Sequence, residues 1–169
     1  MKRTRSEQSS YITPGGELSL SGSALVVLLS AVFQKGRPFR FKAKGGSMWP
    51  FIQHGDIITI HPLGTKSLGL GDVVLFLREK DRMPVVHRIV GGYRDKLLMK
   101  GDSSDTFDGL FSRTDILGKV TQVNRDGRLV RAGLGPERII LGLLSNMRFL
   151  RVIASSFRRF LRFIDRKVK

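Results

Sequence analysis

Short alternating segments separated by turn residues fill the middle of the chain and constrain its fold more than any other feature. Residues 39 to 44 alternate apolar and basic side chains with the two-residue period of a half-exposed strand. Further short strands are expected at 56–61, 73–77, 85–90, 97–100 and 117–124. Breaks rich in glycine, proline or Asp-Gly separate them at 54–55, 69–71, 83–84, 91–92 and 126–127. Segments this short and evenly spaced predict an antiparallel β barrel or sandwich.

Helical periodicity is expected only near the two ends. An apolar run beginning near Ser23 predicts a helix that stops at Gly36, a residue suited to the left-handed position after a helix. Beyond Gly135-Pro136 a period of 3.6 residues returns, first at 139–144 and then in a longer terminal segment. We therefore predict a mainly β (α+β) chain, divided into a flexible arm at 1–22, a helix packed on the core at 23–36, a β domain at 37–131 and a basic amphipathic helical extension at 136–169.

The terminal extension carries much of the charge. The net charge of the chain is +16, and residues 128–169 hold 11 basic and 2 acidic groups. At 100° per residue, aromatic and aliphatic side chains from Phe149 to Ile164 gather opposite six arginines. Two interpretations are equally supported. Either the apolar face packs on the core, or residues 148–169 lie in the plane of an anionic membrane surface and bind it. Specific nucleic-acid binding is not expected, because no motif for it is present.

Targeting signals and metal chemistry find little support in the sequence. The apolar run at 24–33 is only ten residues long, whereas about twenty are needed to span a bilayer as a helix, and no small-residue cleavage site follows it. We expect a cytoplasmic location, or peripheral attachment at the inner face of the membrane. The chain contains no cysteine and three histidines, which excludes disulfides and thiolate catalysis, and we expect neither a metal nor another cofactor.

A glycine-preceded serine is the first candidate for chemistry. In Gly45-Gly46-Ser47-Met48-Trp49-Pro50, the glycines lack the Cβ atoms that would crowd a substrate and allow the hydroxyl of Ser47 to be presented at a strand end. Pro50 stiffens the turn that follows. Alone, this stretch is more typical of an ordinary loop.

A serine nucleophile needs a neighbouring base. His54 and His61 lie at turns, where a surface role is the simpler interpretation, but His87 sits within the β-branched run at 85–90. An ionisable ring there is unusual unless it faces a partner, although a satisfied core histidine is the alternative. Asp102, Asp105 and Asp108 follow in a polar loop, which lacks the spacing of a calcium loop, and one of them could orient a histidine in the Ser-His-Asp manner.

Three blocks together resemble a known family, the type I signal peptidases and their relatives that share a fold with the self-cleaving domain of the LexA repressor. The blocks are Gly46-Ser47-Met48-Trp49-Pro50 with Gly55-Asp56, Gly71 to Phe76, and Val86-His87-Arg88-Ile89-Val90 with Lys100-Gly101-Asp102. They occur in the family's order and cover roughly residues 39 to 124. The resemblance implies a signal-peptidase-like antiparallel, barrel-like core.

The resemblance also implies roles for particular residues. Bacterial signal peptidases usually have lysine where this chain has His87, whereas archaeal and endoplasmic-reticulum enzymes have histidine, so this chain resembles the histidine branch. Ser47 is then the nucleophile, His87 the general base and Asp108 the orienting acid. Asp102 is a structural acid, while Gly46 and Met48 belong to the substrate loop. The implied activity is that of a serine endopeptidase acting on a peptide or protein with a leader segment.

Two departures from the family pattern affect these expectations. Many members have serine two residues before the nucleophile, where Gly45 stands here, so the oxyanion hole would rest on backbone amides including that of Ser47. The usual transmembrane anchor is also not expected.

Two alternatives remain open on the same fold. One is a self-cleaving LexA-type regulator, which would normally use lysine as base and carry a DNA-binding helical domain. The other is a non-catalytic module that binds peptides along a strand edge beside Ser47.

Overall fold

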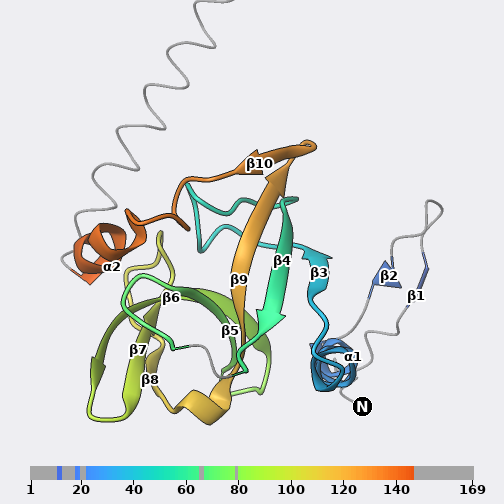
Figure 1. Ribbon diagram of the computed structural model, residues 1–169, viewed down its shortest axis with the longest axis horizontal. Helices are drawn as coiled ribbons and strands as arrows, with labels where there is room; N and C mark the ends of the chain where they lie inside the picture. The colour runs from blue at the N-terminus through green and yellow to red at the C-terminus, as the bar shows by residue number, and fades with distance from the viewer. Residues whose placement is uncertain (1–10, 13–17, 20–21, 65–66, 79, 147–169) are drawn as a thin grey trace, which may run out of the picture.

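An antiparallel sheet forms the body of the protein in the computed structural model, which describes residues 11–12, 18–19, 22–64, 67–78 and 80–146 (Figure 1). Its strands are β3 (Phe39–Lys42), β4 (Ile57–Pro62), β5 (Val73–Leu77), β6 (Pro84–Tyr93), β7 (Lys96–Lys100), β8 (Gly109–Phe111), β9 (Ile116–Arg125) and β10 (Arg128–Val130). They lie in the order β3-β4-β9-β5-β6-β7-β8, an open path, and β10 pairs with β9 beside it. The predicted mainly β, antiparallel fold is confirmed.

The predicted strands all appear, and three details of the sheet differ from expectation. β8 and β10 are short strands that the sequence does not predict. The break predicted at Gly91-Gly92 is wrong, because β6 continues through both glycines with an irregular register next to Gly91. A Cβ on Gly92 would lie 2.9 Å from the carbonyl oxygen of Lys96, so glycine here permits close strand pairing instead of ending the strand. The predicted hairpin at 126–127 joins β9 to β10.

Two helices flank the sheet. Figure 1 shows α1 (Gly22–Gln34) beside β3 and α2 (Arg138–Asn146) beside β6, far apart in the view. α1 buries Leu29 completely against the core of β3, β4, β5 and β9, and its Phe33 lies against Gly118 of β9. A second cluster of buried side chains fills the space between β5, β6, β7 and β8. None of the helices in the described part of the chain has the length and apolar character needed to cross a membrane.

The elements near the two ends of the chain can be compared with the predicted regions. Within the predicted arm, the two-residue strands β1 (Tyr11–Ile12) and β2 (Leu18–Ser19) pair with each other. At the other end, α2 corresponds to the apolar stretch expected at 139–144. The segment 148–169, for which we predict a basic amphipathic helix, lies outside the described residues. The boundaries of the proposed regions therefore stay predictions.

A short helical turn, η1 (Arg113–Asp115), connects β8 to β9. The chain thereby passes from the edge of the sheet at β8 back to its centre at β9, between β4 and β5. The predicted site residues lie on the turn before β4, on β6 and on the loop after β7, which contact one another.

Candidate active site

Ser47 is an exposed residue in the turn that leads from β3 to β4. Tight backbone hydrogen bonds shape this turn: the amide of Trp49 donates to the carbonyl of Gly46, and the amide of Ile52 donates to that of Met48. Met48 and Ile52 are buried in the main hydrophobic core, with 4% and 5% of their surfaces exposed. These buried side chains thus hold Ser47 at the surface on a fixed backbone.

His87 lies in β6, opposite Val74 of β5, and only 8% of it is exposed. Its ring packs 6.2 Å from the ring of the fully buried Phe76. The buried setting that the strand pattern predicts is therefore present, and the ring has polar partners on both nitrogens.

A continuous line of hydrogen bonds joins the three residues predicted for catalysis. His87 Nε2 lies 2.8 Å from Ser47 Oγ, and His87 Nδ1 lies 2.6 Å from Asp108 Oδ2. An ionised carboxylate can only accept, so a neutral ring paired with ionised Asp108 would carry its proton on Nδ1. Nε2 is then left as an acceptor for the hydroxyl proton of Ser47. This is the arrangement by which a histidine can take a proton from a serine.

Asp108 reaches this position from the loop between β7 and β8. Its amide donates to the carbonyl of Met99 in β7 at 2.9 Å, and the side chains of Asp108 and His87 are 15% and 10% exposed. The neighbouring Gly109 has φ +123, a conformation that side-chain-bearing residues rarely adopt. The glycine lets the chain turn into β8 directly after the carboxylate.

The start of the same loop touches the serine turn directly. The amide of Ser103 donates to the carbonyl of Ser47 at 2.9 Å, and the Ser103 hydroxyl donates to the carbonyl of Gly46 at 2.7 Å. A Cβ on Gly101 would lie 2.8 Å from the Ser47 carbonyl oxygen and 3.0 Å from His87 Nε2. Glycine at 101 is therefore what allows the loop, the serine turn and the histidine to meet.

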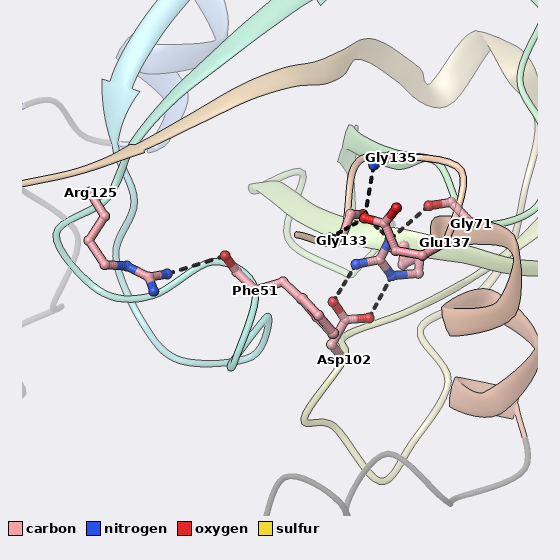
Figure 2. A network of polar contacts seen from close by, with 8 residues as sticks. Phe51, Gly71, Asp102, Arg125, Gly133, Gly135 and Glu137 are labelled. Carbon is pink, nitrogen blue, oxygen red and sulfur yellow. Dashed lines mark hydrogen bonds and ion pairs between the residues drawn. The ribbon is translucent and has the colours of Figure 1, made fainter. Parts of the chain in front are cut away.

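Asp102, predicted as a structural acid, anchors this loop to β6. Its carboxylate accepts hydrogen bonds from both Nε and Nη2 of Arg88 at 2.7 Å, and the two side chains are fully buried. Nη1 of Arg88 donates at 2.8 Å to the carbonyls of Gly71 and Gly133, the partners drawn in Figure 2. A buried ion pair is tolerated only when its remaining donors are satisfied, and these carbonyls satisfy them.

Phe51 connects this buried pair to a second, partly exposed ion pair. The guanidinium of Arg88 lies 5.5 Å from the centre of the Phe51 ring, and Nη2 of Arg125 donates to the Phe51 carbonyl at 3.2 Å (Figure 2). Arg125 also makes two 2.8 Å contacts with the carboxylate of Asp56. Two arginines from distant strands thus hold the turn that bears Ser47.

Burial and hydrogen bonding act in opposite directions on Asp56. Burial alone would raise the pKa of this carboxyl, but hydrogen bonds from Arg125 and from the amide of Gln53, with the charge of Arg125, bring the pKa below its ordinary value of 3.8. Asp56 is therefore ionised and paired at neutral pH.

Residues after β10 complete the hydrogen-bond network around Arg88. Oε1 of Glu137 accepts the amides of Gly133 and Gly135 at 2.8 and 3.1 Å (Figure 2). A hydrogen bond from its own amide, together with these two, holds the pKa of the Glu137 carboxyl below its ordinary value. The turn that supplies the Gly133 carbonyl to Arg88 is fixed in this way.

The two glycines before Ser47 differ in conformation. Gly45 has φ +88, and its amide donates to Nδ1 of His54 at 3.4 Å. A serine, which many signal peptidases have at the matching position, would be strained on this backbone although a Cβ there would meet nothing within 4 Å. Open space also surrounds the Cα of Gly46, which leaves room beside the serine for a substrate backbone.

The remaining candidates lie elsewhere or have other contacts. His61 contacts the hydroxyl of Thr121 through Nδ1, at 2.8 Å, on a different part of the sheet. Asp105 is exposed in the loop after β7, and the carboxylate that contacts His87 is that of Asp108. Within the described residues, no group of three or more His, Cys, Asp or Glu side chains is placed to hold a metal ion.

The sequence marks the supporting residues less clearly than the central ones. Arg88, Ser103, Arg125 and Glu137 support the site, and sequence reasoning misses all four in this role. Many of their partners are backbone carbonyls or amides, such as the carbonyl of Gly133, and no side-chain motif marks these. The arginine directly after His87 is the one available signal, because a charged residue inside a buried strand requires a counter-charge.

Comparison with known proteins finds two relatives, and both have the same description. SEC11 of Ogataea parapolymorpha, a signal peptidase complex catalytic subunit, is 32% identical over 127 residues, which cover 61% of this chain and 62% of the relative. SEC11 of Eremothecium gossypii, described in the same words, is 34% identical over 91 residues, covering 50% and 51%. No family model matches the chain. This chain therefore spans between half and two thirds of the length of these relatives, and the similarity supports a signal-peptidase-like relationship.

Proposed function

We propose that this protein is a serine endopeptidase of the signal-peptidase type, in which Ser47 is the nucleophile, His87 the general base and Asp108 the orienting acid. The observation that carries the proposal is the unbroken line of contacts from Ser47 Oγ through the His87 ring to Asp108, at 2.8 and 2.6 Å. The likeness to signal peptidase catalytic subunits supports the same reaction class.

The proposed reaction begins when Ser47 Oγ attacks the carbonyl carbon of a peptide bond. The hydroxyl proton passes to His87 Nε2, and the carboxylate of Asp108 stabilises the imidazolium at Nδ1. His87 then gives the proton to the leaving amine, the C–N bond breaks and an acyl-enzyme remains on Ser47. Water, deprotonated by the same histidine, hydrolyses the ester and restores the serine.

The developing oxyanion needs donors near Ser47. With glycine at 45, no hydroxyl is available two residues before the nucleophile, so we assign this role to backbone amides, including that of Ser47. Loss of one donor in such sites typically reduces the rate by about a hundredfold or more. We therefore expect slow turnover compared with enzymes that have the hydroxyl.

The proposed substrate is a leader or signal-like segment of a peptide or protein. The open space beside Gly46 lets an extended chain approach Ser47, which is an exposed residue. Signal peptidases of the histidine branch use a histidine as the general base. We propose that this chain, with His87, belongs to that branch.

Cleavage of synthetic leader peptides by the full chain, followed by mass spectrometry, tests the proposal. We expect the wild type and Ser67→Ala to give the same products, since Ser67 is an exposed serine in the loop between β4 and β5. Ser47→Ala should give none. Equal cleavage by Ser47→Ala would contradict the proposed nucleophile, and cleavage only of the chain itself, seen as a change in its own mass, would instead identify a self-cleaving regulator.

If folded wild-type protein binds these peptides but leaves them intact under all conditions, the non-catalytic module is the better account. Cleavage by the wild type separates the two cases, and fluorescence anisotropy with Ser47→Ala shows whether this variant has lost cleavage without losing peptide binding. The enzyme account predicts that this variant still binds the peptide it no longer cleaves.

A further inference from the structure

The outer face of α2 exposes aliphatic side chains to solvent. Ile139, Ile140 and Leu143 are 49%, 60% and 52% exposed, and they fall within about 100° of one another around the helix. Large aliphatic side chains that stand together on a helix without a cover point to an interaction surface.

This face cannot turn inward, because contacts on the opposite side of α2 fix its rotation. Arg138 Nε donates to Asp72 at 2.9 Å, and Asp72 is only 3% exposed in the turn before β5. A Cβ on Gly142 would lie 3.0 Å from the amide nitrogen of Gly71, so helix and turn touch through glycine. The three aliphatic residues are therefore held outward by the same packing that attaches α2 to the sheet.

The amino-acid sequence beyond α2 contains further large apolar residues, from Met147 to Ile164. Residues 148–169 also contain 8 basic residues and 1 acidic one. This is a pattern of the sequence alone, since these residues lie outside the described part of the chain.

We propose that the exposed face of α2, defined by Ile139, Ile140 and Leu143, docks onto the surface of an anionic lipid bilayer. Charge complementarity favours this occupant, because apolar residues followed by a strongly basic segment suit the boundary between acyl chains and anionic headgroups. A second copy of the chain fits less well. Three half-exposed side chains offer far less than the roughly 800 Å² that each partner contributes to a standard protein interface.

Cosedimentation of the full chain with vesicles tests this surface directly. We expect binding to vesicles of phosphatidylcholine with phosphatidylglycerol, weaker binding to phosphatidylcholine alone, and a decrease with added salt. Ile140→Asp should lower the partition coefficient at least about tenfold, since it places a charge in the apolar face. The matched control is Val27→Asp, because Val27 is 71% exposed on α1, at the other side of the sheet, and should bind as the wild type does.

A labelling experiment keeps the proposal testable if Ile140→Asp does not fold. The chain has no cysteine, so Ile140→Cys and Val27→Cys each accept one environment-sensitive fluorophore. Anionic vesicles should shift the emission of the label at position 140 to the blue and leave that at position 27 unchanged.

Three results would overturn the proposal: wild-type binding by Ile140→Asp, loss of binding by Val27→Asp alone, or no shift of the label at position 140. The last result would fit residues 147–169 covering the α2 face. A lipid-free dimer that Ile140→Asp dissociates would also overturn it. Ser47→Ala should bind vesicles like the wild type, so peptidase activity and membrane docking can fail separately.

Discussion

At the scale of single residues, the candidate site depends on one position with no side chain. Gly101 is the point where the loop after β7 passes both the Ser47 carbonyl and His87 Nε2. The nitrogen that faces Gly101 is the one that contacts the Ser47 hydroxyl. Whether Ser47 and His87 meet is therefore decided by a residue that carries no chemistry of its own.

Gly101→Ala should abolish most activity while leaving the fold intact. Its methyl group would lie 2.8 Å from the Ser47 carbonyl oxygen and 3.0 Å from Nε2, so the serine turn or the imidazole must move. A displacement of up to about an ångström in such a contact costs on the order of a hundredfold in kcat.

Leader-peptide cleavage and circular dichroism together check this prediction. The control is Gly64→Ala, in the loop after β4, where a Cβ would meet no neighbour and φ is +50, so it tests backbone strain without touching the site. Unchanged kcat in Gly101→Ala would show that the close contact is not limiting.

At the scale of elements, ion pairs with buried carboxylates attach the loops to the sheet. Arg88 in β6 holds Asp102 in the loop after β7, and Arg125 in β9 holds Asp56 in the turn before β4. Each pair joins a strand to one of the two segments that meet at Ser47. The loops are thereby fixed by long-range contacts that their local sequence does not contain.

Asp102→Asn should destabilise the protein by about 3–5 kcal/mol, because it leaves the buried guanidinium of Arg88 without its counter-charge. Urea unfolding measures this. The comparison is Asp81→Asn, which weakens the exposed pair of Asp81 with Arg78 and should have a far smaller effect, as exposed pairs generally do. Similar losses in the two variants would contradict the structural role of the Arg88–Asp102 pair.

The Arg125–Asp56 pair predicts a particular dependence on acid. The folded pKa of Asp56 lies below its ordinary value of 3.8, so the pair contributes stability that is fully present above that value and is lost as the pH falls through the folded pKa. The difference in unfolding free energy between wild type and Arg125→Met should be constant near neutral pH and shrink in acid. Arg128→Met, at an exposed position of β10, should show no such change. A difference that grows in acid would contradict the account.

The sequence predicts the elements better than their junctions. Each expected strand is present because alternation and glycine or proline breaks act locally, whereas β8 and β10 have three residues each and too little pattern to detect. The error at Gly91-Gly92 has the same origin: a glycine that permits close strand pairing cannot be distinguished from one that ends a strand without knowing its neighbours.

The candidate site is predictable to a similar extent. Ser47, His87 and Asp108 follow from residue types and from the resemblance to a family, and the structure brings these three side chains into contact. The arginines that support them cannot be found in this way, because carbonyls such as that of Gly133 become partners only after the chain has folded. The catalytic roles themselves stay predictions.

At the scale of the whole molecule, the sheet brings together three segments that are far apart in the chain. The turn after β3, the strand β6 and the loop after β7 supply one residue each, separated by 40 and 21 positions. The segment between β10 and α2 closes the network around Arg88, and α2 itself presents its aliphatic face to solvent. The proposed reaction and the proposed membrane surface thus lie on neighbouring elements, although each can be tested alone.

The central claim is that Ser47 and His87 act as one catalytic unit, and a double-mutant cycle on kcat/KM tests it most directly. Ser47→Ala and His87→Ala should each lower kcat/KM by at least about 10³-fold, and the double variant should be no worse than either single one, because removing either partner disables the same step. Losses that multiply in the double variant, or a His87→Ala variant that keeps wild-type kcat/KM, would contradict the account.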